Sequence, residues 1–133
     1  MAHSKEAYRS PEFGSKITSV LFGVSRETLS NYALLEQSLL DALKKDRFTI
    51  LDVRKRYFEP EGMTIVVVLG ESHAAIHTYH EHNSMSFEVS SCRGPTDGMV
   101  AFEHFISKIP HRYHETEQKP YRIAEPKEKR GTL

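Results

Sequence analysis

Residues 70–79, GESHAAIHTY, bring a nucleophile and two bases into one short segment. Ser72 follows the acidic residue Glu71, and His73 and His77 lie four residues apart. A serine close to histidines and a carboxylate raises two kinds of chemistry: hydrolysis through an activated hydroxyl, and metal binding through clustered imidazoles. The secondary structure around these residues decides which of the two chemistries is geometrically possible.

The metal hypothesis starts from four histidines within ten residues, which are His73, His77, His80 and His82. A strand rises about 3.3 Å per residue, so two residues four apart are separated by roughly 13 Å and cannot share one ion. Only His80 and His82, on either side of Glu81, are close enough to chelate locally, and a solvated turn explains them as well. We therefore expect no metal site.

The hydrolase hypothesis requires Ser72 and His77 to meet. No G-x-S-x-G motif surrounds Ser72. A separation of five residues also places His77 on the opposite face of an ideal strand from Ser72. On these residues alone, a serine at the start of a strand and a half-buried histidine remain the simpler interpretation.

The surrounding pattern predicts an antiparallel sheet. Runs of β-branched and aromatic residues indicate strands at 16–22, 48–58, 63–69, 73–79 and 84–90, with a last short strand at 120–125. The turn signals EPEG and HEHN keep the links between them short, which favours antiparallel neighbours.

Two helices are predicted beside this sheet. Apolar residues recur at three and four over 27–45, apart from Glu36, and again over 96–109. Their inward sides would be Leu29, Ala33, Glu36, Leu39, Leu40 and Leu43, and Met99, Phe102, Phe105, Ile106 and Ile109. Ser25 or Thr28 is a suitable cap for the first helix. The expected fold is α+β, a two-layer α/β sandwich with both helices on one face of the antiparallel sheet.

Composition narrows the class of protein. Among 133 residues, 18 Lys and Arg balance 18 Asp and Glu, so no overall positive field would attract nucleic acid. The single cysteine, Cys92, excludes an internal disulfide and fits a reducing compartment. The longest apolar run, MTIVVVLG, is too short for a membrane helix, and residues 1–13 lack the apolar centre of a secretion signal. We expect a soluble cytoplasmic protein with a flexible N-terminal arm (1–13), one domain (14–125) and a charged tail (126–133).

Four segments carry a resemblance to a known family. They are GSKITSVLFGV (14–24), FTILDV (48–53), FEPEG (58–62) and ESHAAIHTYHE (71–81), and the last is the most specific. Together they resemble the S-adenosylmethionine decarboxylase family of the short prokaryotic type. The resemblance covers about residues 14 to 125.

The resemblance implies that Ser72 is consumed. In that family the serine hydroxyl attacks the preceding carbonyl, and elimination and hydrolysis then leave a covalent pyruvoyl group on the new N-terminus. By resemblance, cleavage between Glu71 and Ser72 would give a β chain (1–71) and an α chain (72–133). His77 matches the residue that transfers the proton in processing, and Thr64 stands where a supporting serine is found. Such a reaction requires a distorted peptide at 71/72 and a donor that polarises its carbonyl.

The same resemblance assigns the decarboxylation site. The pyruvoyl ketone would form a Schiff base with the substrate amine, and Cys92 matches the proton donor, a role that suits a thiol pKa near 8.5. Phe58 and Tyr79 match the aromatic residues that sandwich adenine, and Glu81 matches the residue that holds the ribose. Glu88 and Arg93 fall in or near the site, although a solvent-facing strand position and a surface charge explain them equally well.

The substrate stays open between two classes. Tyr79 replaces the usual tryptophan, His80 replaces the usual proline, and EVSSCRGP (88–95) replaces DVFTCG. Relatives in the family decarboxylate arginine or ornithine, and Glu81 or Glu88 could pair with such a cation. S-adenosylmethionine is the first expectation, arginine or ornithine the alternative, and an unprocessed regulatory homologue a second alternative. The family implies a homodimer of αβ protomers that acts on a small molecule in polyamine synthesis, without nucleic acid or membrane partners.

Overall fold

Six antiparallel strands form a single sheet in the order β2-β3-β4-β5-β1-β6. The structure is a computed structural model and describes residues 9–131. Its elements are β1 (Phe13–Phe22), α1 (Arg26–Leu29), α2 (Tyr32–Lys45), β2 (Ile50–Tyr57), β3 (Met63–Leu69), β4 (Ser72–Tyr79), β5 (Ser84–Ser91), α3 (Met99–Lys108) and β6 (Tyr113–Arg122), with 3₁₀ turns at His80–His82 and Lys127–Lys129.

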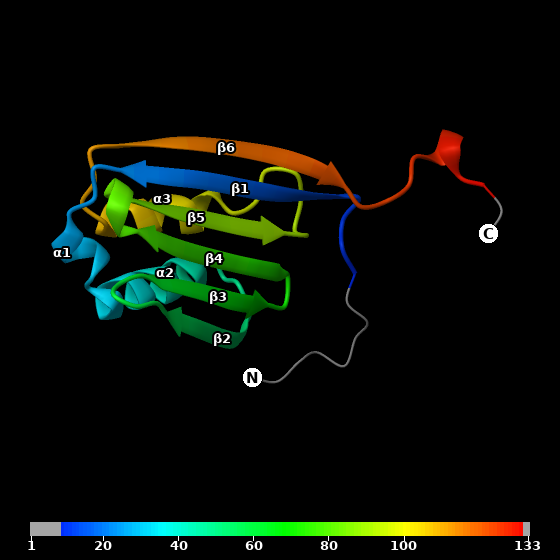
Figure 1. The fold of residues 1–133 in the computed structure, drawn as a ribbon. Helices are drawn as coiled ribbons and strands as arrows, with labels where there is room; N and C mark the ends of the chain where they lie inside the picture. Colours follow the sequence, from blue (N-terminus) through cyan, green and yellow to red (C-terminus); the bar gives the residue numbers. More distant parts are fainter. Residues whose placement is uncertain (1–8, 132–133) are drawn as a thin grey trace.

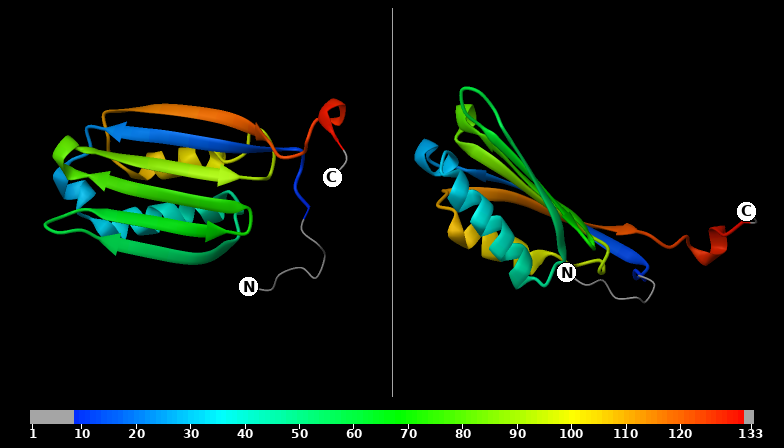
Figure 2. Two further views of the ribbon diagram at one scale, coloured as in Figure 1. Left: turned by 45° about the vertical axis from the view of Figure 1, so that its right-hand side comes forward. Right: turned by 90° about the horizontal axis from the view of Figure 1, so that it is seen from below.

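The two long helices, α2 and α3, lie side by side on one face of the sheet (Figures 1 and 2). The opposite face carries no helix and faces the viewer in Figure 1. We call it the open face. This arrangement confirms the predicted two-layer α+β sandwich, in which antiparallel strands need a hydrophobic layer on one side only.

The core lies between the helices and the sheet. Alternate residues of β3, Met63, Ile65, Val67 and Leu69, are buried there, whereas Val68 on the open face is 41% exposed. This period of two follows from the pleat of the strand. The same alternation in β4 sends Ala74 and Ile76 to the core and leaves His73 and His77 for the open face.

The first predicted helix is divided. The span 27–45 was predicted to be continuous, but α1 ends at Leu29 and α2 begins at Tyr32. Asn31 causes the break, because its side chain accepts a hydrogen bond from the Leu34 N–H (3.2 Å) and its own backbone is not helical. In α2, Leu39 and Leu43 are buried as predicted, but Leu35 is buried in place of Ala33, which is exposed. Ser25 caps α1, as one of the two predicted caps.

The last predicted strand was wrong in position. A short strand was expected at 120–125, but β6 spans Tyr113–Arg122 and pairs with β1 along its whole length. The sequence YHETEQKPYR gives no apolar signal because β6 is an edge strand and mostly exposed. Pro120 is acceptable there, since an edge strand has one side free of ladder hydrogen bonds.

The sheet runs from β1, which begins at Phe13, to β6, which ends at Arg122, and the predicted domain bounds of 14 and 125 stay a prediction. Lys127–Lys129 forms the 3₁₀ turn within the predicted tail. Most of the predicted arm, residues 1–8, lies outside the described residues, as do residues 132 and 133.

Candidate active site

The peptide between Glu71 and Ser72 lies in the tight turn that joins β3 to β4. Ser72 has a φ of 149°, a conformation that glycine adopts easily and other residues rarely do. The backbone N–H of Cys92 donates to the carbonyl oxygen of Glu71, with an N···O distance of 3.0 Å. A strained peptide whose carbonyl is held by a donor is the arrangement expected for attack on that carbonyl.

The Glu71 side chain is fixed as well. Its carboxylate accepts hydrogen bonds from the backbone N–H of Thr49 (2.9 Å) and from the Thr49 hydroxyl (3.0 Å). The N–H of Gly70 donates to the Thr49 carbonyl at 2.8 Å. The turn is therefore held by the residue that directly precedes β2.

The imidazole close to the Ser72 hydroxyl is that of the next residue, His73. Ser72 Oγ lies 3.2 Å from Nδ1 of His73. Sequence reasoning considered His73 only as a metal ligand and missed this contact. A base at this distance is suited to accept the hydroxyl proton when Oγ attacks.

His77 and Thr64 form a pair away from Ser72. Thr64 Oγ1 and His77 Nδ1 are 2.8 Å apart, and the two residues face each other across β3 and β4. The sequence assigned each of these residues a part in processing without predicting this contact, and both roles stay predictions. Five residues of strand separate His77 from Ser72 in the same chain, which corresponds to about 16 Å. The structure therefore does not bring His77 to its own Ser72.

The predicted adenine-binding residues lie at the other end of the sheet from Ser72. Phe58 follows β2, Tyr79 ends β4 and Glu81 belongs to the next 3₁₀ turn. Phe58 and Tyr79 are 51% and 38% exposed. Seven residues of strand place Tyr79 about 23 Å from Ser72, so one chain does not unite the two sets.

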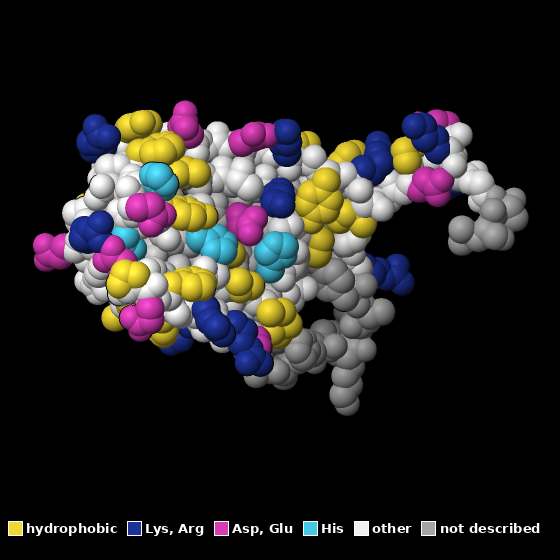
Figure 3. All heavy atoms as spheres, in the orientation of Figure 1, with side chains coloured by type: hydrophobic (Ala, Val, Ile, Leu, Met, Phe, Trp, Pro, Cys, Tyr) yellow, Lys and Arg dark blue, Asp and Glu magenta, His cyan; other side chains and the backbone are white. Residues whose placement is uncertain are grey.

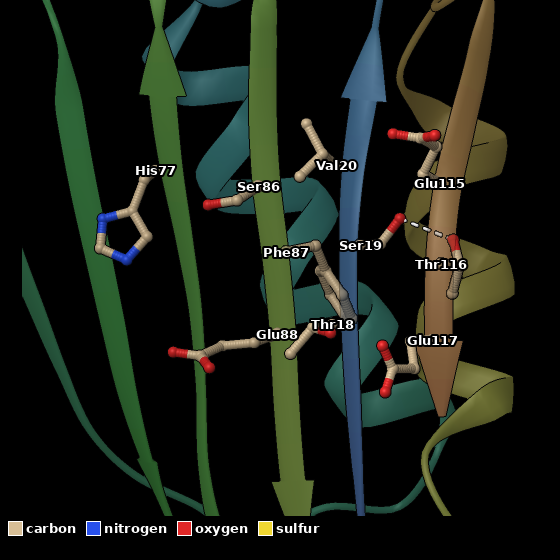
Figure 4. A pocket seen from close by; sticks show the side chains of 10 residues that line it. All are labelled: Thr18, Ser19, Val20, His77, Ser86, Phe87, Glu88, Glu115, Thr116 and Glu117. Carbon is tan, nitrogen blue, oxygen red and sulfur yellow. Dashed lines mark hydrogen bonds between the residues drawn. The ribbon is translucent and has the colours of Figure 1, made fainter. Parts of the chain in front are cut away.

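A hollow of about 420 Å³ occupies the open face over β4, β5, β1 and β6 (Figure 4). The side chain of Glu88 extends over β4 toward the side of the hollow that His77 lines. Its carboxylate is 3.9 Å from Lys16 Nζ and only partly exposed. The hollow is lined by Thr18, Ser19, Val20, His77, Ser86, Phe87, Glu88, Glu115, Thr116 and Glu117.

Acidic residues gather around this hollow. Three of the lining residues are glutamates, and Figure 3 shows acidic and histidine side chains over the middle of the face. Two of these glutamates already face lysines: Glu88 lies 3.9 Å from Lys16 Nζ, and Glu117 lies 2.8 Å from Lys119 Nζ. Glu88 therefore lines the same hollow as His77, and its role in substrate binding stays a prediction.

Arg93 is not a surface charge. Its side chain is 25% exposed, lies over the Phe48 ring with Cζ 3.7 Å from the ring centre, and makes two hydrogen bonds to Asp97 (2.7 and 3.2 Å). Burial alone would lower the pKa of Arg93, but the bonds and charges of Asp97, together with Asp46 and Glu71, raise it. Burial raises the pKa of Asp46, although the N–H of Ala101 and the charge of Arg93 oppose that change.

The His80 side chain is buried beneath the 3₁₀ turn that it begins. It is 2% exposed, and Nε2 is 2.9 Å from the Ser30 hydroxyl while Nδ1 has no partner among the described residues. Burial, followed by the charge of Arg26, lowers the pKa of His80. His80 is thus buried, whereas His73, His77 and His82 are at least partly exposed. Within residues 9–131, no group of three or more His, Cys, Asp or Glu side chains is arranged to hold a metal ion.

A comparison with protein families identifies the chain. The model of the S-adenosylmethionine decarboxylase family matches residues 16–119. The chain belongs to this family. The resemblance seen in the four sequence segments is thereby confirmed, and the matched region contains all of the candidate residues from Thr49 to Asp97.

Individual members of the S-adenosylmethionine decarboxylase family agree. An S-adenosylmethionine decarboxylase proenzyme 2 from Bacillus cereus is 33% identical over 103 residues, which are 77% of this chain and 84% of that protein. A proenzyme from a Geobacillus species is 32% identical over 107 residues, 80% of this chain and 86% of that protein.

A solved structure shares the fold. The crystal structure of the adenosylmethionine decarboxylase from Aquifex aeolicus matches with a TM-score of 0.77 at 24% identity, over 92% of this chain and 98% of that one. Within the part of this chain that the structure describes, no helix combines the length and apolar character needed to cross a membrane.

Proposed function

We propose that this chain is a self-processing decarboxylase of S-adenosylmethionine, which cleaves itself between Glu71 and Ser72 to make its own cofactor. The observation that carries the proposal is the Glu71–Ser72 peptide, with a φ of 149° at Ser72 and the Cys92 N–H on the Glu71 carbonyl. Family membership supports the activity, since the relatives are named as decarboxylase proenzymes.

Processing begins when Ser72 Oγ adds to the carbonyl carbon of Glu71. The hydroxyl proton passes to His73, and the Cys92 N–H stabilises the negative charge that develops on the carbonyl oxygen. The C–N bond then breaks and leaves an ester between Glu71 and the Ser72 side chain, with a free amine at Ser72.

Elimination follows from the ester. A base removes the Cα proton of Ser72, and the Cβ–Oγ bond breaks with Glu71 leaving as a carboxylate. The resulting dehydroalanine amine tautomerises to an imine, and water replaces its nitrogen, which departs as ammonia. The product is the pyruvoyl group of the 72–133 chain. His77, held through Nδ1 by Thr64, leaves Nε2 available to be that base.

The pyruvoyl group would supply the carbonyl that accepts electrons as carbon dioxide leaves the substrate. The residues fit its formation, because Ser72 and Cys92 sit on neighbouring strand ends joined by the Glu71–Cys92 hydrogen bond. The Cys92 thiol returns a proton to the substrate carbon. Phe58 and Tyr79 stack on adenine, Glu81 binds the ribose hydroxyls, and Glu88 lies where a cationic centre would be attracted.

The distances within one chain support a proposal in which two copies share each site. His77 and Tyr79 lie about 16 and 23 Å along β4 from Ser72, too far to act on it within one protomer. If two open faces pack with their strands reversed about a two-fold axis, the Ser72 end of one protomer lies over the His77 end of its partner. The proposed unit is therefore a homodimer with two shared sites.

The test begins with the mass of the purified chain. Two fragments, 1–71 and 72–133, and a carbonyl on residue 72 that borohydride reduces are expected. Release of carbon dioxide is then measured with S-adenosylmethionine, arginine and ornithine in parallel, and S-adenosylmethionine is expected to be preferred. An intact chain that keeps its Ser72 hydroxyl refutes the proposal, and a preference for a plain amino acid refutes the substrate.

A further inference from the structure

The loop after β5 is tied to the body of the protein through Arg93. Besides its two bonds to Asp97, Arg93 donates from Nη2 to Asp46 (3.2 Å) and from Nη1 to the carbonyl of Arg47 (3.2 Å). Its guanidinium stacks on Phe48, the next residue along. The Arg93 side chain is therefore held by three consecutive residues, 46 to 48. A single surface ion pair would use only one of these contacts.

Both carboxylates in this cluster have further bonds. Asp46 accepts from the backbone N–H of Ala101 in α3 (2.9 Å), and Asp97 accepts from the Ser91 hydroxyl (2.5 Å). The Ser91 hydroxyl also accepts from the backbone N–H of Arg93 (3.1 Å). Residues 91 and 93 are thus both fixed, and Cys92 lies between them.

Thr49, the residue after Phe48, fixes Glu71, whose carbonyl oxygen accepts the hydrogen bond from the Cys92 N–H. Thr49 binds the Glu71 carboxylate through its N–H and its hydroxyl. Residues 46–48 therefore fix the backbone next to Cys92 by binding Arg93, and Thr49 fixes Glu71 by binding its carboxylate. The two atoms brought together are the Cys92 N–H and the Glu71 carbonyl oxygen, which are 3.0 Å apart.

We propose that residues 46–49 form a brace which, through Arg93 and Thr49, positions the Glu71 carbonyl on the Cys92 N–H and so controls how fast Ser72 adds to that carbonyl. This rests on the proposed self-cleavage. Arg93 is a positioning residue, since it does not touch the reacting atoms. The brace acts on formation of the ester and leaves the elimination step unchanged.

The test follows cleavage of newly made chain in cell-free synthesis, on denaturing gels over time. Arg93→Met keeps the stacking on Phe48 but removes the guanidinium, and it is expected to slow cleavage roughly 10- to 100-fold, since small misplacements cost that much. Thr49→Val, which keeps its backbone N–H, is expected to slow cleavage less. Arg54→Met is the matched control, because Arg54 is 80% exposed on β2 and pairs with Asp52.

Hydroxylamine separates positioning from a general loss of structure. It cleaves an ester, so His77→Ala, which stalls after ester formation, is expected to be cut by hydroxylamine at 71/72. The uncut Arg93→Met chain is expected to resist hydroxylamine, because its ester forms slowly and does not accumulate. Since Arg93→Met leaves buried carboxylates unpaired, the neutral variant Asp46→Asn/Arg93→Met/Asp97→Asn is tested beside it, and both are assayed well below their melting temperatures.

The outcomes distinguish the two proposals. Slow, hydroxylamine-resistant chains in both folded Arg93 variants support the brace. Wild-type cleavage rates in either folded variant overturn it, as does accumulation of a hydroxylamine-sensitive ester, while leaving self-cleavage itself intact. If the wild-type chain is never cut between Glu71 and Ser72, the proposed function fails and the brace fails with it.

Discussion

The backbone N–H of Cys92 donates to the carbonyl oxygen of Glu71 across 3.0 Å, so the residue that carries the only thiol also holds the peptide at which cleavage is proposed. In the proposed function, the backbone N–H of Cys92 assists cleavage and its side chain donates the proton in decarboxylation. Under this proposal, one residue contributes to both self-processing and catalysis.

This division predicts the behaviour of Cys92→Ala. Alanine keeps the backbone N–H, so the variant is expected to be cleaved at close to the wild-type rate. Loss of the thiol removes the proton donor, and turnover is expected to fall by about 100-fold or more, as is usual when a general acid is removed. Fragment masses and carbon dioxide release measure the two effects separately. Normal turnover in the cleaved variant would exclude the thiol from the reaction.

The strain at Ser72 can be measured without the reaction. Ser72→Ala and Ser72→Gly both lack the hydroxyl and are expected to stay intact. A φ of 149° costs alanine about 1 to 3 kcal/mol but suits glycine, whose greater freedom in the unfolded chain cancels part of the gain. Ser72→Gly is thus expected to be the more stable by about 1 kcal/mol in urea unfolding. Equal stability, or greater stability of the alanine variant, would show that the backbone is relaxed.

Sequence reasoning found the elements whose burial alternates. The strand at 63–69 was placed at its observed bounds because one face of β3 is entirely apolar. It misplaced β6, whose polar residues are held by pairing with β1 and not by burial. It also missed the cap at Asn31, because the apolar repeat continues across it.

For the site, residue types could be predicted but their grouping could not. Ser72, His77 and Cys92 stand out by type and by resemblance to the family. The donor to the Glu71 carbonyl is a backbone N–H, which has no residue signature. The surroundings of Arg93 depend on Asp46, 47 positions away along the chain, and only the fold brings the two together. Exposure of Phe58 and Tyr79 so far from Ser72 likewise becomes visible only in three dimensions.

Stacking on adenine predicts the effect of changing Tyr79. Tyr79→Ala is expected to raise KM for S-adenosylmethionine by about 10-fold or more, since stacking on a base contributes roughly 1 to 3 kcal/mol. Tyr79→Trp keeps an aromatic surface and is expected to stay near the wild type. Tyr113→Ala, which removes a similarly exposed tyrosine from β6, is the control. Equal KM values for Tyr79→Ala and the control would remove Tyr79 from the substrate site.

The lowered pKa of His80 predicts that the stability of the folded protein depends on pH. Burial and the nearby Arg26 lower its pKa in the folded protein below the ordinary value of 6.5, while Glu81 opposes them weakly. The unfolded chain then binds the proton more readily, so stability is lost as pH falls below about 6.5, by at most about 1.4 kcal/mol per pH unit for one proton.

The measurement uses urea unfolding of the intact Ser72→Ala chain at pH 7.5 and 5.5, at one protein concentration. His80→Gln in the same background retains a group that can bond to Ser30 and does not titrate. The loss of stability between the two pH values is expected to be smaller in this variant. An identical loss in both chains would assign the pH dependence to other residues.

A shared active site predicts that two inactive chains restore each other. His77→Ala alone is expected to remain uncleaved after ester formation, and Ser72→Ala alone cannot form the ester. When the two are produced together with different tags, a mixed dimer contains one complete site, made of Ser72 from the first chain and His77 from the second. About half of the His77→Ala chains are then expected to be cut, if chains pair at random about a two-fold axis. The Ser72→Ala chain should stay intact, which serves as the internal control. If His77→Ala chains remain uncut in purified mixed dimers, each protomer must process itself, and His77 would have to reach Ser72 across about 16 Å of its own strand, which a straight β4 does not allow.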